Sequence, residues 1–113
     1  MPGKRYLRII SMKAQPGMGD AFVKKFRKDV ASTALDLDGL RRLFLFRSED
    51  KKDDFVVVSI WQGEDKAKKY VKSGKNKAYV NKLSEVQKGR ERVRGFYLEL
   101  DVEGRKYRKK RSN

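Results

Sequence analysis

The segment that most constrains the fold is residues 55–61, Phe-Val-Val-Val-Ser-Ile-Trp, because it is apolar or small at every position. Aromatic and β-branched residues at this density predict a β-strand. Successive side chains of a strand point to opposite faces of its sheet, so both faces of this strand must be covered. The run Leu43-Phe44-Leu45-Phe46, inside a strand expected at residues 40–48, makes the same demand.

Other apolar patterns predict two more strands, at residues 6–14 and 93–102, and two helical regions. The first helix is expected at residues 18–35, where Phe22, Phe26 and Val30 recur every four residues and basic residues occupy the other side. The second covers residues 64–72 and, after Ser73-Gly74, residues 75–88. The order β-α-β-β-α-β is that of the ferredoxin-like α+β fold with an antiparallel sheet.

Two helical regions can cover only one face of a four-stranded sheet. A homodimer joined sheet to sheet would cover the other face, and the alternative is a monomer with a partly exposed apolar sheet. The length of 113 residues fits one domain. We place this domain at residues 1–104 and expect residues 105–113 to form a basic, flexible tail.

The chain contains no cysteine and no histidine, which excludes much chemistry. Disulfides, thiolate nucleophiles, iron–sulfur ligation, Ser-His-Asp catalysis and the usual zinc sites are all ruled out, so we expect no metal site. The longest apolar run is too short for a membrane span or a signal-peptide core. We therefore expect a soluble, cytoplasmic protein with no membrane partner.

The formal net charge is +15, which favours polyanionic partners. A basic band on the second helical region comprises Lys66, Lys68, Lys69, Lys72, Lys75 and Lys77. The candidate nucleic-acid-binding residues of the tail are Arg105, Lys106, Tyr107, Arg108, Lys109, Lys110 and Arg111, with an aromatic ring among phosphate-binding side chains. One interpretation is binding to structured RNA, for example in a ribosome-associated protein, and the other is a highly charged, solvated surface.

Three motifs, in their order and spacing, resemble the antibiotic-biosynthesis-monooxygenase-like family of dimeric α+β barrels. They are Gly17-Met18-Gly19-Asp20-Ala21-Phe22, Gly39-Leu40, and the strand Phe55 to Trp61 followed by Glu64, Ala67, Tyr70 and Ser73. The resemblance implies a homodimer with a cavity between sheet and helices in each subunit. It also implies either a cofactor-independent monooxygenase or a protein that binds a small aromatic molecule, and it leaves open which of these applies.

A haem-degrading branch of the family uses a histidine, an asparagine and a tryptophan. The places that correspond to them here hold Val80, Ile10 and Tyr70, so histidine-ligated haem degradation is not expected, although a tyrosine can ligate haem iron. We expect no cofactor.

Oxygenation of a phenol without a cofactor requires a pocket that binds the phenol and helps it lose a proton. The candidates for that pocket are Trp61, Tyr70, Asn76 and Tyr79. Each also has a purely structural interpretation, since the aromatic residues fit core packing and Asn76 fits a helix cap. The enzyme requires a polar-lined cavity, whereas a nucleic-acid-binding module requires only a contiguous basic surface.

Overall fold

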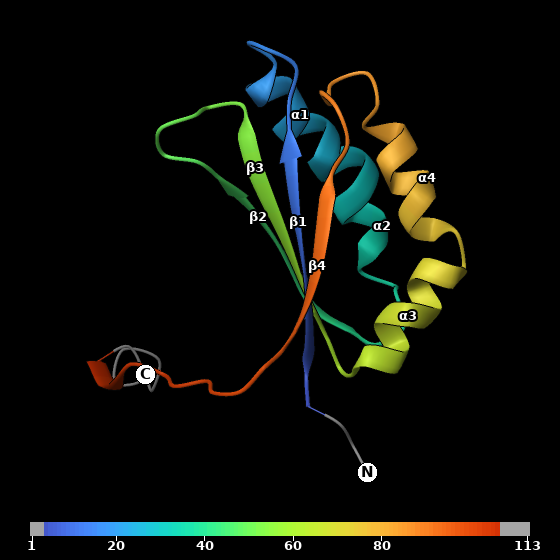
Figure 1. Cartoon of the computed structure of the whole chain (residues 1–113), viewed down its shortest axis with the longest axis vertical. Coiled ribbons are helices and arrows are strands. Elements are labelled where there is room, and N and C mark those ends of the chain that lie inside the picture. Colours follow the sequence, from blue (N-terminus) through green and yellow to red (C-terminus); the bar gives the residue numbers. More distant parts are fainter. Residues whose placement is uncertain (1–3, 107–113) are drawn as a thin grey trace.

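The computed structural model describes residues 4–106. Four strands form one antiparallel sheet in the order β2-β3-β1-β4, and the helices that connect the strands lie on one side of it (Figure 1). In chain order, the elements are β1 (Tyr6–Lys13), α1 (Gly19–Lys25), the π-helix η1 (Phe26–Ala31), α2 (Ser32–Ala34), β2 (Leu40–Arg47), β3 (Asp54–Trp61), α3 (Glu64–Lys72), α4 (Lys75–Lys82) and β4 (Arg92–Tyr97). The ferredoxin-like β-α-β-β-α-β fold is thereby confirmed.

Strand β3 lies in the middle of the sheet and divides its side chains between the two faces. Its burial alternates strictly, so that Phe55, Val57 and Trp61 are buried under the helices. Val56, Val58 and Ile60 point to the opposite face and are only half-buried. The outer face is therefore apolar at the centre of the sheet, as the sequence indicates.

The first helical region forms where the apolar stripe predicts it. The stripe residues Phe22, Phe26 and Val30 are all buried, and the ring of Phe22 stacks on Phe55 at a centroid distance of 4.6 Å. The middle of this region is wound as the π-helix η1. The stripe thus fixes the helix against β3 despite the change in winding.

The predicted end of the last strand at residue 102 is wrong. Strand β4 ends at Tyr97, which pairs with Tyr6, the first residue of β1. Beyond this pair β1 offers no further strand partner, and Leu100 and Val102 are 78% and 74% exposed. Leu98 N–H still donates to the carbonyl of Arg5 at 2.9 Å and Glu99 pairs with Lys4, and the chain that follows runs away from the sheet (Figure 1).

The second helical region also ends earlier than the predicted residue 88. Helix α4 ends at Lys82, and the buried residues Leu83 and Val86 lie in the turns that follow. The backbone carbonyl of Val86 accepts a hydrogen bond of 2.7 Å from Gln15, next to the end of β1. The chain has to leave the helix there to reach the sheet.

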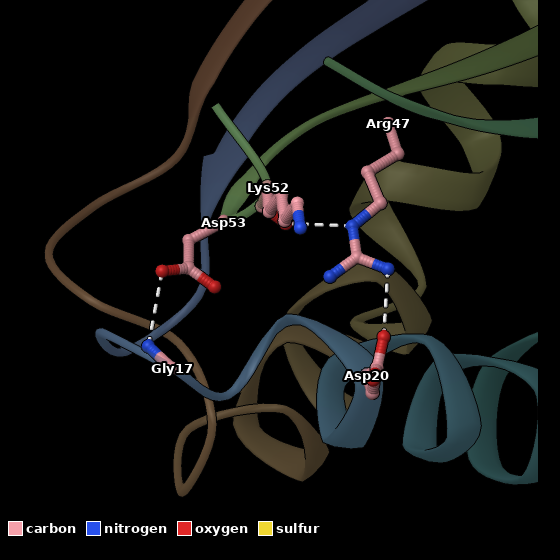
Figure 2. A network of polar contacts seen from close by, with 5 residues as sticks. All are labelled: Gly17, Asp20, Arg47, Lys52 and Asp53. Carbon is pink, nitrogen blue, oxygen red and sulfur yellow. Dashed lines mark hydrogen bonds and ion pairs between the residues drawn. The ribbon is translucent and has the colours of Figure 1, made fainter. Parts of the chain in front are cut away.

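A network of polar contacts joins the β2–β3 loop to the start of α1 (Figure 2). The Arg47 guanidinium donates to the carbonyl of Lys52 at 2.6 Å and to Oδ1 of Asp20 at 2.8 Å. The Asp53 carboxylate accepts from the backbone N–H of Gly17 at 3.0 Å. We call these five residues the loop clamp. It holds the charged loop against the helix layer.

Within residues 4–106, no helix is long and apolar enough to cross a membrane. Of the predicted basic tail, Arg105 and Lys106 are described and are exposed. Tyr107, Arg108, Lys109, Lys110 and Arg111 lie outside the described residues. The domain boundary at residue 104 and the flexibility of the tail stay predictions.

Candidate functional site

A cavity of about 50 Å³ lies between the inner face of the sheet and the helices. Its lining is mostly apolar and comes from β1, β2, β3, η1, α3, α4 and β4. All four residues that the sequence nominates contribute to this lining: Trp61, Tyr70, Asn76 and Tyr79. The structure thus brings these four candidates together around one space, while their chemical role stays a prediction.

One end of the cavity is polar because three side chains converge there. Asn76 Oδ1 accepts from the Tyr70 hydroxyl at 3.3 Å and from Nη1 of Arg8 at 3.4 Å. The Arg8 guanidinium carbon lies 5.7 Å from the centroid of the Tyr70 ring. We call Arg8, Tyr70 and Asn76 the polar triad. Guanidinium and phenol hydrogens here can donate to an oxygen atom that enters the cavity.

Arg8 is the most unusual member of the polar triad, since it is a cation that is only 7% exposed. Among residues 4–106, no carboxylate lies within ion-pair distance of its guanidinium. Burial lowers the pKa of Arg8, with the opposing influence of Tyr70 in second place. Arginine keeps its proton even so, and a buried charge without a counter-ion is costly. The arrangement therefore favours an anion at this point.

Tyr70 complements Arg8 as a neutral donor. Burial raises its pKa to about 12, and the nearby Arg8 cation offsets part of that rise. At neutral pH the phenol is therefore protonated and can donate a hydrogen bond. Its ring stands between Trp61 and Tyr79, with centroid distances of 5.0 and 6.2 Å.

Trp61 and Ser59 form the wall beside the triad. Trp61 is 1% exposed, and its indole N–H donates to Oγ of Ser59 at 2.9 Å. Because this bond uses the one donor of the indole, Trp61 offers the cavity an apolar surface. Trp61 is thus both a core residue and a wall of the cavity.

Sequence reasoning missed the two charged residues of the described lining, Arg8 and Glu91. A signal for Arg8 was present: it shares the strand phase of Ile10 and Met12, which face the helices, so the period of two places its side chain inside. For Glu91 no such signal exists, since it precedes β4 in a run of charged residues. It is the single carboxylate in the described lining, and it accepts from Nε2 of Gln87 at 3.1 Å.

The three places that correspond to haem-branch residues, Ile10, Tyr70 and Val80, all line the same cavity. The departures from that branch therefore lie at the site itself. Neither Ile10 nor Val80 carries an atom that could ligate a metal. In the part of the chain that the structure describes, no group of three or more carboxylates could hold a metal ion.

Comparisons with known proteins agree with this architecture. The family model described as antibiotic biosynthesis monooxygenase matches residues 5–82. The chain belongs to this family. The matched region contains the polar triad and ends at the last residue of α4. A search of the curated proteins finds no match.

Solved structures similar to this chain share its fold at low sequence identity. The cofactor-independent oxygenase SnoaB of Streptomyces nogalater superimposes with a TM-score of 0.73 at 15% identity, covering 88% of this chain and 97% of that one. A protein of unknown function from Nitrosomonas europaea superimposes with a TM-score of 0.74 at 12% identity, covering 92% of this chain and 98% of that one. A conserved protein from Methanosarcina mazei superimposes with a TM-score of 0.72 at 12% identity, covering 87% of this chain and 96% of that one. These three solved structures share one fold with this chain over most of their length.

Proposed function

We propose that the chain is a cofactor-independent oxygenase that acts on a small phenol. The observation that carries this proposal is Arg8, a buried cation without a carboxylate partner in the described structure, at the polar end of an apolar cavity. A phenolate oxygen would supply the missing negative charge, and the apolar lining would surround the ring. Membership of the monooxygenase family and the likeness to SnoaB support the same chemistry.

In this reaction a phenol and O₂ give a quinone and water. The ring is oxidised, one oxygen atom enters it, and the second leaves in water with the two hydrogens that the phenol loses. Arg8 would stabilise the phenolate, which is the form that transfers electrons to O₂. Tyr70 would turn its hydroxyl hydrogen from Asn76 Oδ1 to the developing peroxide oxygen. Glu91 is the carboxylate in the cavity that can accept a proton.

The size of the cavity limits the substrate. A space of about 50 Å³ corresponds to roughly three to five water molecules. A phenol ring therefore requires one wall to move outward. Helix α4 contributes Tyr79 and Val80 to the lining but has no fully buried residue, so among the helices that line the cavity it has the least packing to lose. A single-ring phenol fits this picture better than a polycyclic one.

Oxygen uptake by the purified protein with single-ring monophenols tests the proposal. We expect quinone formation in buffer that contains a metal chelator and no flavin. Arg8→Met should lower kcat/KM by about 100-fold, the usual loss for one stabilising donor. Lys77→Met, on the outer side of α4, is the matched control and should leave turnover unchanged. Turnover that survives Arg8→Met, or that requires an added metal or flavin, would contradict the proposal.

We also propose that two copies pair through the outer faces of their sheets. This face presents apolar side chains from every strand: Leu7, Ile9, Phe44, Phe46, Val56, Val58, Ile60 and Phe96. Phe46 is 53% exposed and stacks on Phe44. A contiguous apolar face of this kind is typical of a subunit interface.

A second candidate function is nucleic-acid binding, which the lysines of α3 and α4 favour. In residues 4–106, Lys66 and Lys68 form ion pairs, whereas the exposed residues Lys69, Lys72, Lys75, Lys77 and Lys82 form none. Fluorescence anisotropy with structured RNA and duplex DNA over a salt series tests this function. Submicromolar binding near physiological salt with a steep salt slope would support it, and binding that disappears at modest salt would refute it.

A further inference from the structure

A second hollow, of about 130 Å³, opens on the outer side of the helix layer where α3 meets α4. Three lysines line it, Lys66, Lys69 and Lys75, together with Leu37, Asp38, Tyr70 and Ser73. We call this hollow the lysine groove. It is larger than the inner cavity, and charged or polar residues make up most of its lining.

The lysine groove and the inner cavity are neighbours. Leu37 and Tyr70 line both of them, so a wall one side chain thick separates the two spaces. Gly74, which follows the groove residue Ser73, has a φ of +84° that allows the chain to turn between α3 and α4. A molecule longer than one ring can therefore occupy both spaces if the Tyr70 and Leu37 side chains part.

The charge of the lysine groove is positive and only partly compensated. Nζ of Lys66 pairs with Oδ2 of Asp38 at 2.9 Å, which neutralises one lysine. Among residues 4–106 neither Lys69 nor Lys75 forms an ion pair, although the charge of Lys69 acts on Asp38, and both lysines are exposed. Two ammonium groups outside ion pairs thus flank the groove, and Arg8 lies beyond the wall. Cationic side chains therefore lie on both sides of the wall, in the lysine groove and in the inner cavity.

We propose that the substrate is an aromatic carboxylate whose phenol end enters the inner cavity and whose carboxylate stays in the lysine groove between Lys69 and Lys75. This inference rests on the proposed function, since it names the substrate class of the same site. A carboxylate at one end of a single-ring phenol matches two cationic positions separated by an apolar wall. The field of the lysines also attracts such an anion toward the cavity.

The single tryptophan of the chain, Trp61, lies in the cavity wall, so its fluorescence reports occupancy directly. The probes are 3-(4-hydroxyphenyl)propanoate and its methyl ester, in which a methyl group removes the charge at the far end. We expect the acid to bind at least 10-fold more tightly than the ester at low ionic strength. The preference should shrink as salt is added, because the groove is open to solvent.

Two double variants locate the source of the preference. Lys69→Gln with Lys75→Gln should weaken binding of the acid about 10-fold and leave the affinity for the ester unchanged. Lys77→Gln with Lys82→Gln removes the same charge from α4 outside the groove and should preserve the preference. Equal affinity for acid and ester, or equal losses in the two double variants, would overturn the inference.

The ester separates failure of the inference from failure of the proposed function. In one outcome the ester quenches Trp61, loses its binding in Arg8→Met, and yet binds as tightly as the acid. That result would support the phenol site and overturn the role of the lysine groove. Absence of quenching by both probes would overturn both.

Discussion

Arg8 has opposite effects on stability and on the proposed binding of an anion. A buried cation without a counter-ion costs stability, and replacement of buried charges by apolar groups of similar size is often neutral or stabilising. We therefore expect Arg8→Met to raise the free energy of unfolding by about 1 kcal/mol or leave it unchanged, even as binding is lost. Urea denaturation followed by Trp61 fluorescence measures this, since Trp61 is buried.

Phe22→Ala is the comparison variant for that experiment. The Phe22 side chain is 0% exposed, and its truncation should cost about 3–5 kcal/mol. A loss of similar size in Arg8→Met would identify Arg8 as a structural residue and remove the main support for the proposed function.

Tyr70 makes stability depend on pH in the alkaline range. Its folded pKa of about 12 lies above the ordinary tyrosine value of about 10, so the fold favours the protonated phenol. This contribution is intact below pH 10 and is lost as pH rises through about 12. Because the ring is only partly buried, we expect a loss of about 1–2 kcal/mol in the wild type.

Tyr70→Phe should show a shallower decline of stability over the same range. Denaturation midpoints at several pH values between about 9 and 12 provide the comparison. The hydrogen bond to Glu64 also raises the pKa of Tyr97, but this contribution is present in both proteins and cancels. Identical slopes for wild type and variant would show that Tyr70 is not desolvated in the folded state.

At the scale of elements, the loop clamp explains why α1 begins with Gly19. A Cβ atom added at Gly19 would lie 2.6 Å from the carbonyl oxygen of Lys52 and also collide with Arg47. Since the first of these obstacles is backbone, the β2–β3 loop has to shift. We expect Gly19→Ala to lower the free energy of unfolding by about 1–3 kcal/mol.

Lys24→Ala, at an exposed position of the same helix, is the control for Gly19→Ala and should change stability by less than about 0.5 kcal/mol. Thermal denaturation of both variants is sufficient. If Gly19→Ala is as stable as Lys24→Ala, the loop does not approach the helix as closely as Figure 2 shows.

The sequence predicted best those elements whose boundaries are set locally. Helix α3 starts and ends where the apolar stripe and Ser73-Gly74 place it, and β2 and β3 differ from prediction by one residue at one end. The end of β4 depends on where β1 begins, and the end of α4 depends on the pairing of Gln87 with Ala14. Those boundaries are set by contacts between distant segments, which periodicity does not contain.

The candidate site follows the same division. Aromatic candidates such as Tyr70 and Tyr79 were predicted because their residue type carries chemistry and their helix was evident. Arg8 was missed because an arginine in a strand is ordinarily taken as exposed, although its phase with Ile10 and Met12 directs it to the helix side of the sheet, where the strand order then places it beside the cavity. Burial of a charge becomes visible once the strand order is known.

At the scale of the whole molecule, the outer sheet face decides the state of assembly. Val58 lies at the centre of this face, in register with Ile9 on β1 and Phe44 on β2. In a symmetric dimer, a carboxylate at this position would be buried twice without a partner, at a cost of several kcal/mol. We expect the wild type to sediment as a dimer at micromolar concentration and Val58→Asp to sediment as a monomer.

The control for Val58→Asp is Val71→Asp, which makes the same chemical change on α3, where the side chain is already 44% exposed. It should remain a dimer, because it lies on the helix side of the sheet. Circular dichroism of both variants establishes that the fold is retained, which the half-buried position of Val58 permits. A monomeric wild type would show instead that the apolar sheet face is exposed to solvent, the alternative that the sequence left open.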